Sequence, residues 1–401
     1  MSAYLLDVLT FLLRWLHVVA AIAWIGESFY FVALDRGLKR PKDAPANALG
    51  EMWSVHGGGF YHKQKYLVAP NGVPEELHWS KWKSYTTWLS GFALFTLAYL
   101  AAPSIHLVDP AVRALSGEQA VLLALAFPVV AWFAYDLLCR LVGFRDGVLG
   151  VLVAALVLAL DYAATQLFAG RAAFLLVGAA LGTIMSANVF FTIIPGQKRM
   201  VAALARGEEV DPLPGKRGKQ RSVHNTYFTL PVVFAMLSNH YAVAYAHEQR
   251  WAILALFMLA GALIRQFFVL WHSGGRAWGL LAAGGLVLAA TFAWLAPRPP
   301  VGAAHGREPS TQQPANEALS PVTTAQVREI AAKHCAQCHS AKPTLMPSAP
   351  KGTMFDTEAQ VEQNALLIHQ QVVVLKIMPP GNLTQLSDAD RDAIGRWFES
   401  R

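Results

Sequence analysis

Long apolar runs separated by short polar segments fill the first three quarters of the sequence. A helix needs about 20 residues to cross the roughly 30 Å hydrocarbon core of a bilayer, and eight runs are near or above that length. They lie near residues 5–34, 85–105, 118–139, 147–168, 172–194, 226–246, 250–272 and 277–296. The pattern therefore predicts an all-α, polytopic membrane helix bundle of about eight spans, surrounded by lipid, for residues 1–296.

Composition and charge support a membrane location and predict the orientation of the spans. Hydrophobic residues make up 54% of the chain and charged residues only 15%, and the 12 Trp residues suit helices anchored at the lipid boundary. Eighteen Lys and Arg residues fall in the loops of one side, against only Arg113, Arg171 and Arg250 on the other. This bias predicts that the N-terminus and everything after the last span lie outside. The net charge of +7 then belongs to the inner loops, and no nucleic-acid partner is expected.

The last quarter of the chain has a different pattern. Residues 297–321 are rich in Pro, Ala and polar residues without apolar periodicity, which predicts a flexible linker. Residues 322–401 are expected to form a separate small domain, with a first helix capped by Thr323 and Gln326 and a last helix beginning at Ser387. The linker leaves two modes open, a domain that shuttles and one that docks permanently.

A haem-attachment motif lies early in this second domain. In KHCAQCHSAK, Cys335 and Cys338 have the spacing that binds the two vinyl groups of haem c as thioethers, and His339 follows as an iron ligand. Met378, before two prolines, is expected as the second iron ligand, as in class I cytochromes c. Half a zinc site and a redox dithiol are the alternatives for the cysteines, and Met346 and Met354 compete for the second ligand position. Cys139 is interpreted as structural.

The attachment of haem c takes place outside the cytoplasm. This agrees with the orientation that the loop charges predict on independent grounds.

Ionisable residues inside the spans are costly and therefore indicate function. At 1.5 Å per residue, His17 and His240 lie about 4 to 6 Å outward of the span midpoints, which suggests a pair of ligands for a haem b. The alternative is that each is a buried histidine bonded to a neighbouring helix. Arg265 is interpreted as compensating a buried acid or a haem propionate, or as one half of an interhelical ion pair.

A second group of polar residues lies nearer the inner surface. His224, Asn225 and Glu27 belong to it, and the loop residues Trp53, His56 and Phe60 are close to the same boundary. Gly57, Gly58 and Gly59 could either let the backbone approach a ligand or form a simple bend. In the same loop, the segment APNGVP predicts a hairpin or tight turn against the membrane.

Four long segments, together with the CAQCH tail, resemble the membrane-bound urate oxidase, or urate hydroxylase, family whose members carry a C-terminal cytochrome c. They are LHVVAAIAWIGESFYFVALD at 16–35, GGGFYHKQKYLVAP at 57–70, LHWSKWKSYTTWLSGF at 77–92 and HNTYFTLPVVFAMLSNHY at 224–241. The first is also similar to the opening helix of small membrane haem proteins of the protoporphyrinogen-oxidising kind. The histidine of that helix binds haem b, which supports His17 as a ligand by analogy.

The resemblance implies oxidation of urate to 5-hydroxyisourate in purine catabolism, with water as the oxygen source and electrons leaving through haem c to the respiratory chain. It also implies a bacterial inner-membrane protein with a periplasmic cytochrome domain. A terminal oxidase or a soluble cytochrome would accept the electrons, and oligomerisation is left open.

Depth and chemistry then assign roles to individual residues. We expect His224, Glu27 and Asn225 in catalysis, and Trp53, His56, Phe60 and Asn225 in urate binding. A quinol-oxidising membrane cytochrome and a non-catalytic electron-transfer subunit docked to a terminal oxidase are the alternatives.

Overall fold

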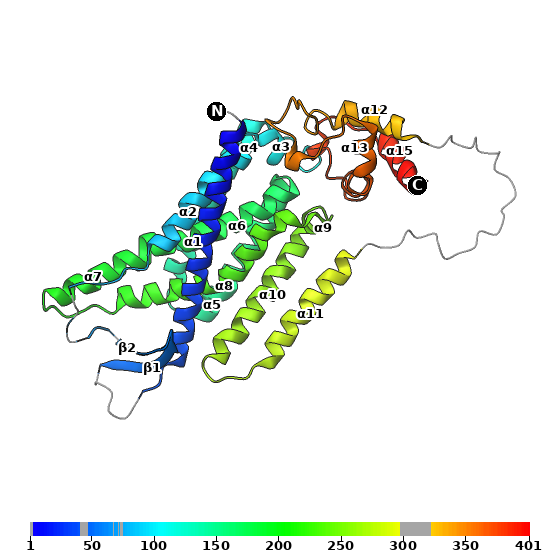
Figure 1. The fold of residues 1–401 in the computed structure, drawn as a ribbon. Coiled ribbons are helices and arrows are strands. Elements are labelled where there is room, and N and C mark those ends of the chain that lie inside the picture. The colour runs from blue at the N-terminus through cyan, green and yellow to red at the C-terminus, as the bar shows by residue number, and fades with distance from the viewer. Residues whose placement is uncertain (1–2, 41–46, 67, 71, 73–74, 297–321) are drawn as a thin grey trace.

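The computed structural model describes residues 3–40, 47–66, 68–70, 72, 75–296 and 322–401 (Figure 1). The expected linker at 297–321 lies outside the described residues. Residues 3–296 are called the membrane part below, after the membrane spans predicted in them. The membrane part contains, in chain order, α1 (Ala3–Gly37), β1 (Ala48–His56), β2 (Gly59–Tyr66), α2 (Trp82–Phe95), the π-helical turn η1 (Thr96–Leu100), α3 (Pro103–His106), α4 (Gly117–Val142), α5 (Asp146–Leu167), α6 (Gly170–Ala187), the π-helical turn η2 (Asn188–Ile193), α7 (Ile194–Ala205), α8 (Leu213–Leu237), the 3₁₀ turn η3 (Ser238–His240), α9 (Ala242–Tyr245), α10 (Arg250–Trp271) and α11 (Trp278–Leu295). The chain is mostly helical, as the apolar pattern predicts.

Within the described residues, six helical segments are long and apolar enough to span a membrane. They are Tyr4–Gly37, Gly117–Val142, Asp146–Leu167, Gly170–Ala205, Arg250–Trp271 and Trp278–Leu295. The other two expected spans fall on α2 with η1 and on α8. The α-helical part of α2 has only 14 residues, and the first half of α8 is rich in Lys and Arg. The count of eight spans therefore stays a prediction.

Helical structure extends beyond the span expected near 172–194. The segment Gly170–Ala205 has 36 residues, about 54 Å of helix at 1.5 Å per residue, which exceeds the hydrocarbon thickness. Pro195 stands in the first turn of α7, where its missing N–H costs no helical hydrogen bond. Residues between α6 and the apolar part of α8, expected as a loop, therefore form two helical arms that project together from the bundle (Figure 1).

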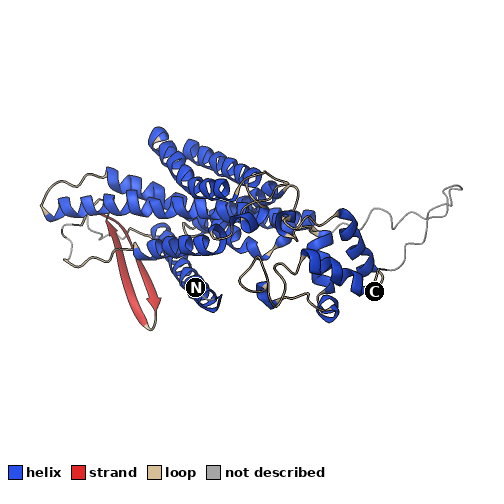
Figure 2. Cartoon of the chain, turned by 90° about the horizontal axis from the view of Figure 1, so that it is seen from above, coloured by secondary structure: helices blue, strands red, loops and turns tan. Residues whose placement is uncertain are grey.

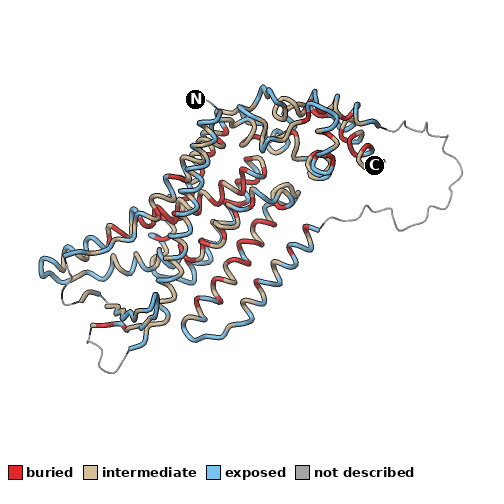
Figure 3. Tube along the Cα trace, in the orientation of Figure 1, coloured by how far each residue is buried: buried red, intermediate tan, exposed pale blue. Residues whose placement is uncertain are grey.

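The core of the membrane part is centred on α6, which packs against α4, α5 and α8. Small residues permit this close packing. A Cβ atom on Gly178 of α6 would lie 3.0 Å from the Cβ of Ala235 on α8, and one on Gly261 of α10 would lie 3.0 Å from the Cβ of Leu230. Small residues at helix crossings are typical of membrane bundles, where backbone approach replaces hydrophobic burial as the driving force. The buried residues gather in these central helices (Figure 3).

The triple glycine forms the turn of a β-hairpin. Strands β1 and β2 are antiparallel, and Gly57 and Gly58 between them have φ of 59° and 79°, values that favour glycine. The hairpin rests on the end of α1, where Lys65 forms an ion pair of 2.5 Å with Asp35. The APNGVP segment is therefore not the hairpin turn, and part of it lies outside the described residues.

The C-terminal part contains α12 (Thr324–His334), η4 (Pro350–Gly352), α13 (Glu358–Gln363), α14 (Ala365–Ile368), η5 (His369–Val374), η6 (Pro380–Asn382) and α15 (Asp388–Glu399). The predicted caps are confirmed, because Thr323 accepts a hydrogen bond from Gln326 N–H and Ser387 accepts one from Asp390 N–H. This part has a hydrophobic core of its own, which includes Val361.

The start of α1 and the C-terminal helices lie at one end of the bundle, and the hairpin lies at the other (Figure 1). Seen from above, the hairpin and the C-terminal part extend in opposite directions (Figure 2). This arrangement is compatible with the predicted orientation of the N-terminus and tail on one side.

Candidate active site

A buried polar network joins three helical segments of the membrane part. Its members are Tyr135 and Asp136 of α4, Asn188 of η2, and Arg221, His224 and Asn225 of α8. His224 and Asn225 lie three and four positions after Arg221 in α8, so the three side chains share one face of the helix. Tyr135 and Asn188 are fully buried. The network lies inside an otherwise apolar bundle, where polar groups mark functional sites.

Asn188 connects the members of this network. Its amide Nδ2 donates to Asn225 Oδ1 at 2.8 Å and to Tyr135 Oη at 3.2 Å, and its Oδ1 accepts from Arg221 Nη1 at 3.3 Å. Asn225 Nδ2 in turn donates to the carbonyl of Met185 at 3.0 Å. Asn188 opens the π-helical turn η2, and such turns inside α-helices are frequent at functional sites.

His224 is oriented by Tyr135. The Tyr135 hydroxyl lies 2.7 Å from His224 Nδ1, and the two rings meet edge to face. The tyrosine oxygen has two lone pairs, so it can accept from Asn188 and also from the Nδ1–H of a neutral His224. We assign the ring proton to Nδ1, so Nε2 carries the free lone pair and is the nitrogen left to take a proton from a substrate.

The network also holds charge. Asp136 accepts from Arg221 Nη2 at 2.6 Å and from Arg140 Nε at 2.6 Å. One carboxylate between two guanidinium groups leaves the cluster with a net positive charge, which suits an anionic ligand. The guanidinium of Arg221 also lies over the Tyr135 ring, 4.9 Å from its centroid.

Asp136 and Arg140 are four positions apart on α4, so their ion pair lies within one helix. Arg221, Asn188 and Tyr135 were not expected in the site. The position of Arg221 one helical turn before His224 is the signal that could have found it.

Glu27 lies on α1 and faces α2, outside this network. Its Oε1 accepts from Lys83 Nζ at 2.7 Å and from Ser80 Oγ at 2.5 Å. The next residue, Ser28, lies 3.4 Å from the hydroxyl of Thr226, which follows Asn225 in α8. Glu27 is therefore adjacent in sequence to a residue that contacts α8, but its carboxylate belongs to a separate ion pair with Lys83.

The expected urate-binding residues of the inner loop lie on the hairpin. Trp53, His56 and Phe60 are all exposed, and Trp53 stacks on His62 with ring centroids 4.3 Å apart. Within the described residues, no hydrogen bond or ring contact joins these three side chains to His224 or Asn225. Of the expected binding set, only Asn225 is a member of the network.

The two residues expected to bind haem b lie in different surroundings. His17 Nδ1 lies 2.9 Å from the carbonyl of Thr87 and 3.2 Å from Ser90 Oγ, both on α2. Its ring fits against bare backbone, since a Cβ on Gly91 would be 2.8 Å from His17 Cε1. A backbone hydrogen bond at Nδ1 leaves Nε2 for a metal, as in many metal-binding histidines. His240 is exposed in η3 at the end of α8.

Among the described residues, neither cysteine of the tail motif forms a disulfide. Burial raises the pKa of the Cys335 thiol to about 12, with a further increase from nearby Cys338 and an opposing effect of Arg391. Burial also raises the pKa of Cys338. Catalytic dithiols need a thiolate of low pKa, so this environment disfavours the redox-dithiol alternative. Cys139 is buried, in agreement with a structural role.

The two expected iron ligands are held by backbone contacts. His339 Nδ1 lies 3.0 Å from the carbonyl of Thr353, so Nε2 is available to a metal. Met378 packs against the same core as Cys335, and Arg391 Nη1 donates to the Met378 carbonyl at 2.9 Å. This donor set fits a covalently bound haem. In the part of the chain that the structure describes, no three His, Cys, Asp or Glu side chains form a metal cluster, and a haem iron between His and Met requires none.

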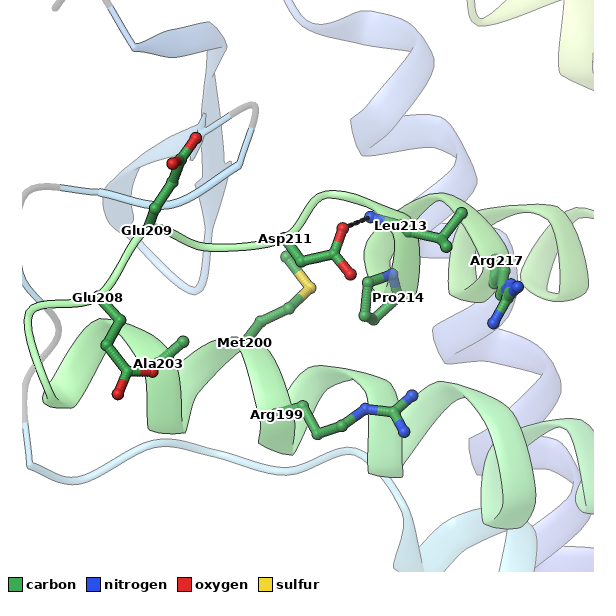
Figure 4. A pocket seen from close by; sticks show the side chains of 9 residues that line it. All are labelled: Arg199, Met200, Ala203, Glu208, Glu209, Asp211, Leu213, Pro214 and Arg217. Carbon is green, nitrogen blue, oxygen red and sulfur yellow. Dashed lines mark hydrogen bonds between the residues drawn. The ribbon is translucent and has the colours of Figure 1, made fainter.

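A separate cleft of about 490 Å³ opens between the two helical arms, α7 and the start of α8 (Figure 4). It is lined by Arg199, Met200, Ala203, Glu208, Glu209, Asp211, Leu213, Pro214 and Arg217. These side chains include acidic and basic groups in similar number and none of the expected site residues. The cleft therefore belongs to the projecting arms and is distinct from the buried network.

The fold and the network together define a multi-pass helical protein with candidate membrane spans and a buried, positively charged, amide-containing site. A family model described as urate oxidase N-terminal matches residues 3–296. The chain belongs to that family, which indicates an oxidoreductase with a urate-related function. No curated protein and no solved structure matches the chain.

Proposed function

We propose that the chain oxidises urate to 5-hydroxyisourate with water as the oxygen source and passes the electrons to a haem c in its tail. The balanced step is urate plus water giving 5-hydroxyisourate, two protons and two electrons. The observation that carries the proposal is the family match over residues 3–296 together with the buried network inside that range.

The network supplies groups suited to a flat, anionic, hydrogen-bonding purine. The net positive charge around Arg221 and Asp136 favours the urate anion over neutral purines. His224, oriented by Tyr135, is positioned to take a proton during the attack of water. Asn225 orients the ring through its amide, and Glu27, paired with Lys83, is a second proton acceptor. Trp53, His56 and Phe60 of the hairpin would contact urate on its way to this site.

The tail is proposed to be a class I cytochrome c domain. Cys335 and Cys338 would form the thioethers, and His339 and Met378 would bind the iron. When bound, the haem supplies a one-electron acceptor. Arg391 donates to the backbone carbonyl of Met378, and the hydrogen bond between His339 Nδ1 and the carbonyl of Thr353 orients the imidazole.

The cellular setting follows from the same proposal. The chain would lie in a bacterial inner membrane with the tail on the periplasmic side, and it would deliver electrons to a terminal oxidase or a soluble cytochrome. A haem b on His17, with His240 as the other ligand, would link the buried site to the tail.

The experiment is urate-dependent reduction of the c-type α-band in the purified full-length protein. Wild type is expected to show reduction on urate addition. Cys335→Ala with Cys338→Ala should abolish the covalent haem signal in a denaturing gel while urate binding persists, and Cys139→Ala is the matched control that keeps both. His224→Ala should slow reduction by about 100-fold or more, as expected for loss of a general base.

Two other outcomes would overturn the proposal. Reduction by a quinol but not by urate would favour the quinol-oxidising cytochrome. Reduction by neither, with electron exchange only against a partner oxidase, would favour the non-catalytic subunit.

A further inference from the structure

Arg265 of α10 is a buried cation without a partner. Its side chain is only 3% exposed, and its Nε and Nη2 atoms form no hydrogen bond. Among the ion pairs of the described residues, none includes Arg265. The expected interhelical acid is therefore absent from the described residues. A buried charge without a counter-charge is strongly unfavourable, so such groups normally have a ligand.

The neighbours of Arg265 make its positive charge more prominent. The guanidinium lies over the ring of Phe29 on α1, 4.0 Å from the centroid. This cation–π contact stabilises the charge but satisfies none of its N–H donors. Tyr227 of α8 donates to Gln266, next to Arg265 in α10, and the charged groups that act on the Tyr227 hydroxyl are the cations Arg36 and Arg265.

The two unpartnered atoms define the shape of the missing ligand. Nε and Nη2 lie on the same edge of the guanidinium, where their N–H groups point in parallel. That edge binds two adjacent acceptor atoms in the bidentate mode typical of carboxylates. An urate anion offers the same pattern along the N–C=O edges of its rings. A single carbonyl or water oxygen would have to accept from both donors at one atom, which bends both hydrogen bonds, whereas two adjacent acceptors allow both to be straight.

We propose that Arg265, between α1, α8 and α10, is an anion-binding residue that anchors a planar ligand with two adjacent acceptor oxygen or nitrogen atoms. Two sources have this chemistry: the urate anion, and the carboxylate of a bound cofactor such as a haem propionate. The urate source rests on the proposed function, whereas the cofactor source does not. Arg221 already forms an ion pair with Asp136, whereas Arg265 has no acidic partner among the described residues, so Arg265 has the more available N–H donors of the two buried arginines.

The test compares Arg265→Gln, Arg265→Lys and Arg250→Gln in the purified full-length protein. Arg250 is the matched control, because it lies on the same helix but already donates to the carbonyl of Thr165. Urate affinity is measured by equilibrium dialysis with labelled urate, and b-type haem per chain by the pyridine haemochrome spectrum. Loss of two charge-assisted bonds should weaken binding of the anion by about 10- to 100-fold or more in Arg265→Gln.

The two sources give different results. If urate is the ligand, Arg265→Gln loses urate affinity at unchanged haem content, and Arg265→Lys loses less. If a cofactor carboxylate is the ligand, Arg265→Gln loses b-type haem, even in a protein that binds no urate. If Arg265→Gln does not fold, the urate affinity and haem content of Arg265→Lys decide between the two sources. This variant keeps the positive charge but lacks the two parallel N–H groups.

The proposal is overturned if the folded Arg265 variants match wild type and Arg250→Gln in both measurements. It is also overturned if wild type itself binds no urate and contains no b-type haem. Failure of the proposed function alone is recognised by retained urate binding or haem content without urate-dependent reduction of the tail.

Discussion

Tyr135 is the residue on which the orientation of His224 depends. Tyr135→Phe keeps the buried ring but removes the hydroxyl between His224 and Asn188. We expect a loss of about 1 to 3 kcal/mol in stability, because two buried polar groups lose a partner, and slower urate oxidation at nearly unchanged urate affinity. The measurements are thermal unfolding in detergent and single-turnover reduction. Tyr162→Phe, at an exposed position of α5, should leave both unchanged. Unaltered kinetics in Tyr135→Phe would contradict the role assigned to His224.

Glu362 makes the stability of the tail dependent on pH. Thr324 donates to this carboxylate, and Arg401 forms an ion pair of 2.5 Å with it, and both contacts lower the pKa of Glu362. A carboxyl whose pKa is lowered by folding stabilises the fold fully above its unfolded pKa, about 4.3, and loses that contribution as pH falls through the folded pKa. Glu362→Gln should therefore weaken hydrogen-exchange protection of α12 and α13 near pH 7. The difference from wild type should disappear near pH 3, and a constant difference across this range would contradict the prediction.

Single polar residues in apolar runs could be found from the sequence, but their partners could not. His224 and Asn225 stand out because few polar residues occur in α8 after them. Asn188 and Tyr135 lie in runs that read as ordinary spans, and only the packing of α4, η2 and α8 brings them to His224. The hairpin residues Trp53 and Phe60 were grouped with the site by depth alone, which does not determine which way a loop folds.

At the scale of elements, the contact of α1 with α2 depends on Gly91. A Cβ at this position would lie 2.8 Å from Cε1 and 3.2 Å from Nδ1 of His17, and the hydrogen bonds at Nδ1 hold the ring in place. Gly91→Ala should therefore cost about 1 to 3 kcal/mol through overpacking and should lower any b-type haem bound by His17. Gly182→Ala is the matched control, since a Cβ there has nothing within 4 Å. Equal melting temperatures and haem content in the two variants would contradict this account.

Helices were predictable as elements because apolar runs of sufficient length have few alternatives in a membrane. Their ends were less predictable. The helix that begins at Gly170 continues through the π-helical turn η2 to Ala205, and α8 begins at Leu213, far before its apolar part. Charged residues in these arms suggested a loop, although Lys and Arg are good helix formers. The hairpin turn was expected at APNGVP and not at Gly57 and Gly58, because polar residues on both faces interrupt the apolar alternation of the two strands.

At the scale of the whole molecule, the tail contacts the end of the membrane part at which α1 begins, the end that the loop charges predict to face outward. Gly381 of η6, three residues after Met378, is the point of contact. A Cβ there would lie 3.1 Å from the carbonyl of Val108 and 3.5 Å from the Cα of Asp109. Gly381 also has a φ of 53°, which favours glycine. Of the two modes that the linker allows, shuttling and docking, this contact favours docking, at a point three residues from the expected Met ligand.

Disulfide trapping tests this docked arrangement. Asp109→Cys with Gly381→Cys should cross-link readily on mild oxidation, because the two positions are within the span of a disulfide. A protease site placed in residues 297–321 separates the fragments on a non-reducing gel unless they are linked. The matched control, Gly57→Cys with Gly381→Cys, puts one thiol at the hairpin, at the opposite end of the bundle (Figure 1), and should stay unlinked. A haem spectrum before oxidation checks that Gly381→Cys folds. Equal, slow cross-linking in both pairs would show that the tail moves freely, and electron transfer would then require its diffusion on the linker rather than a fixed contact.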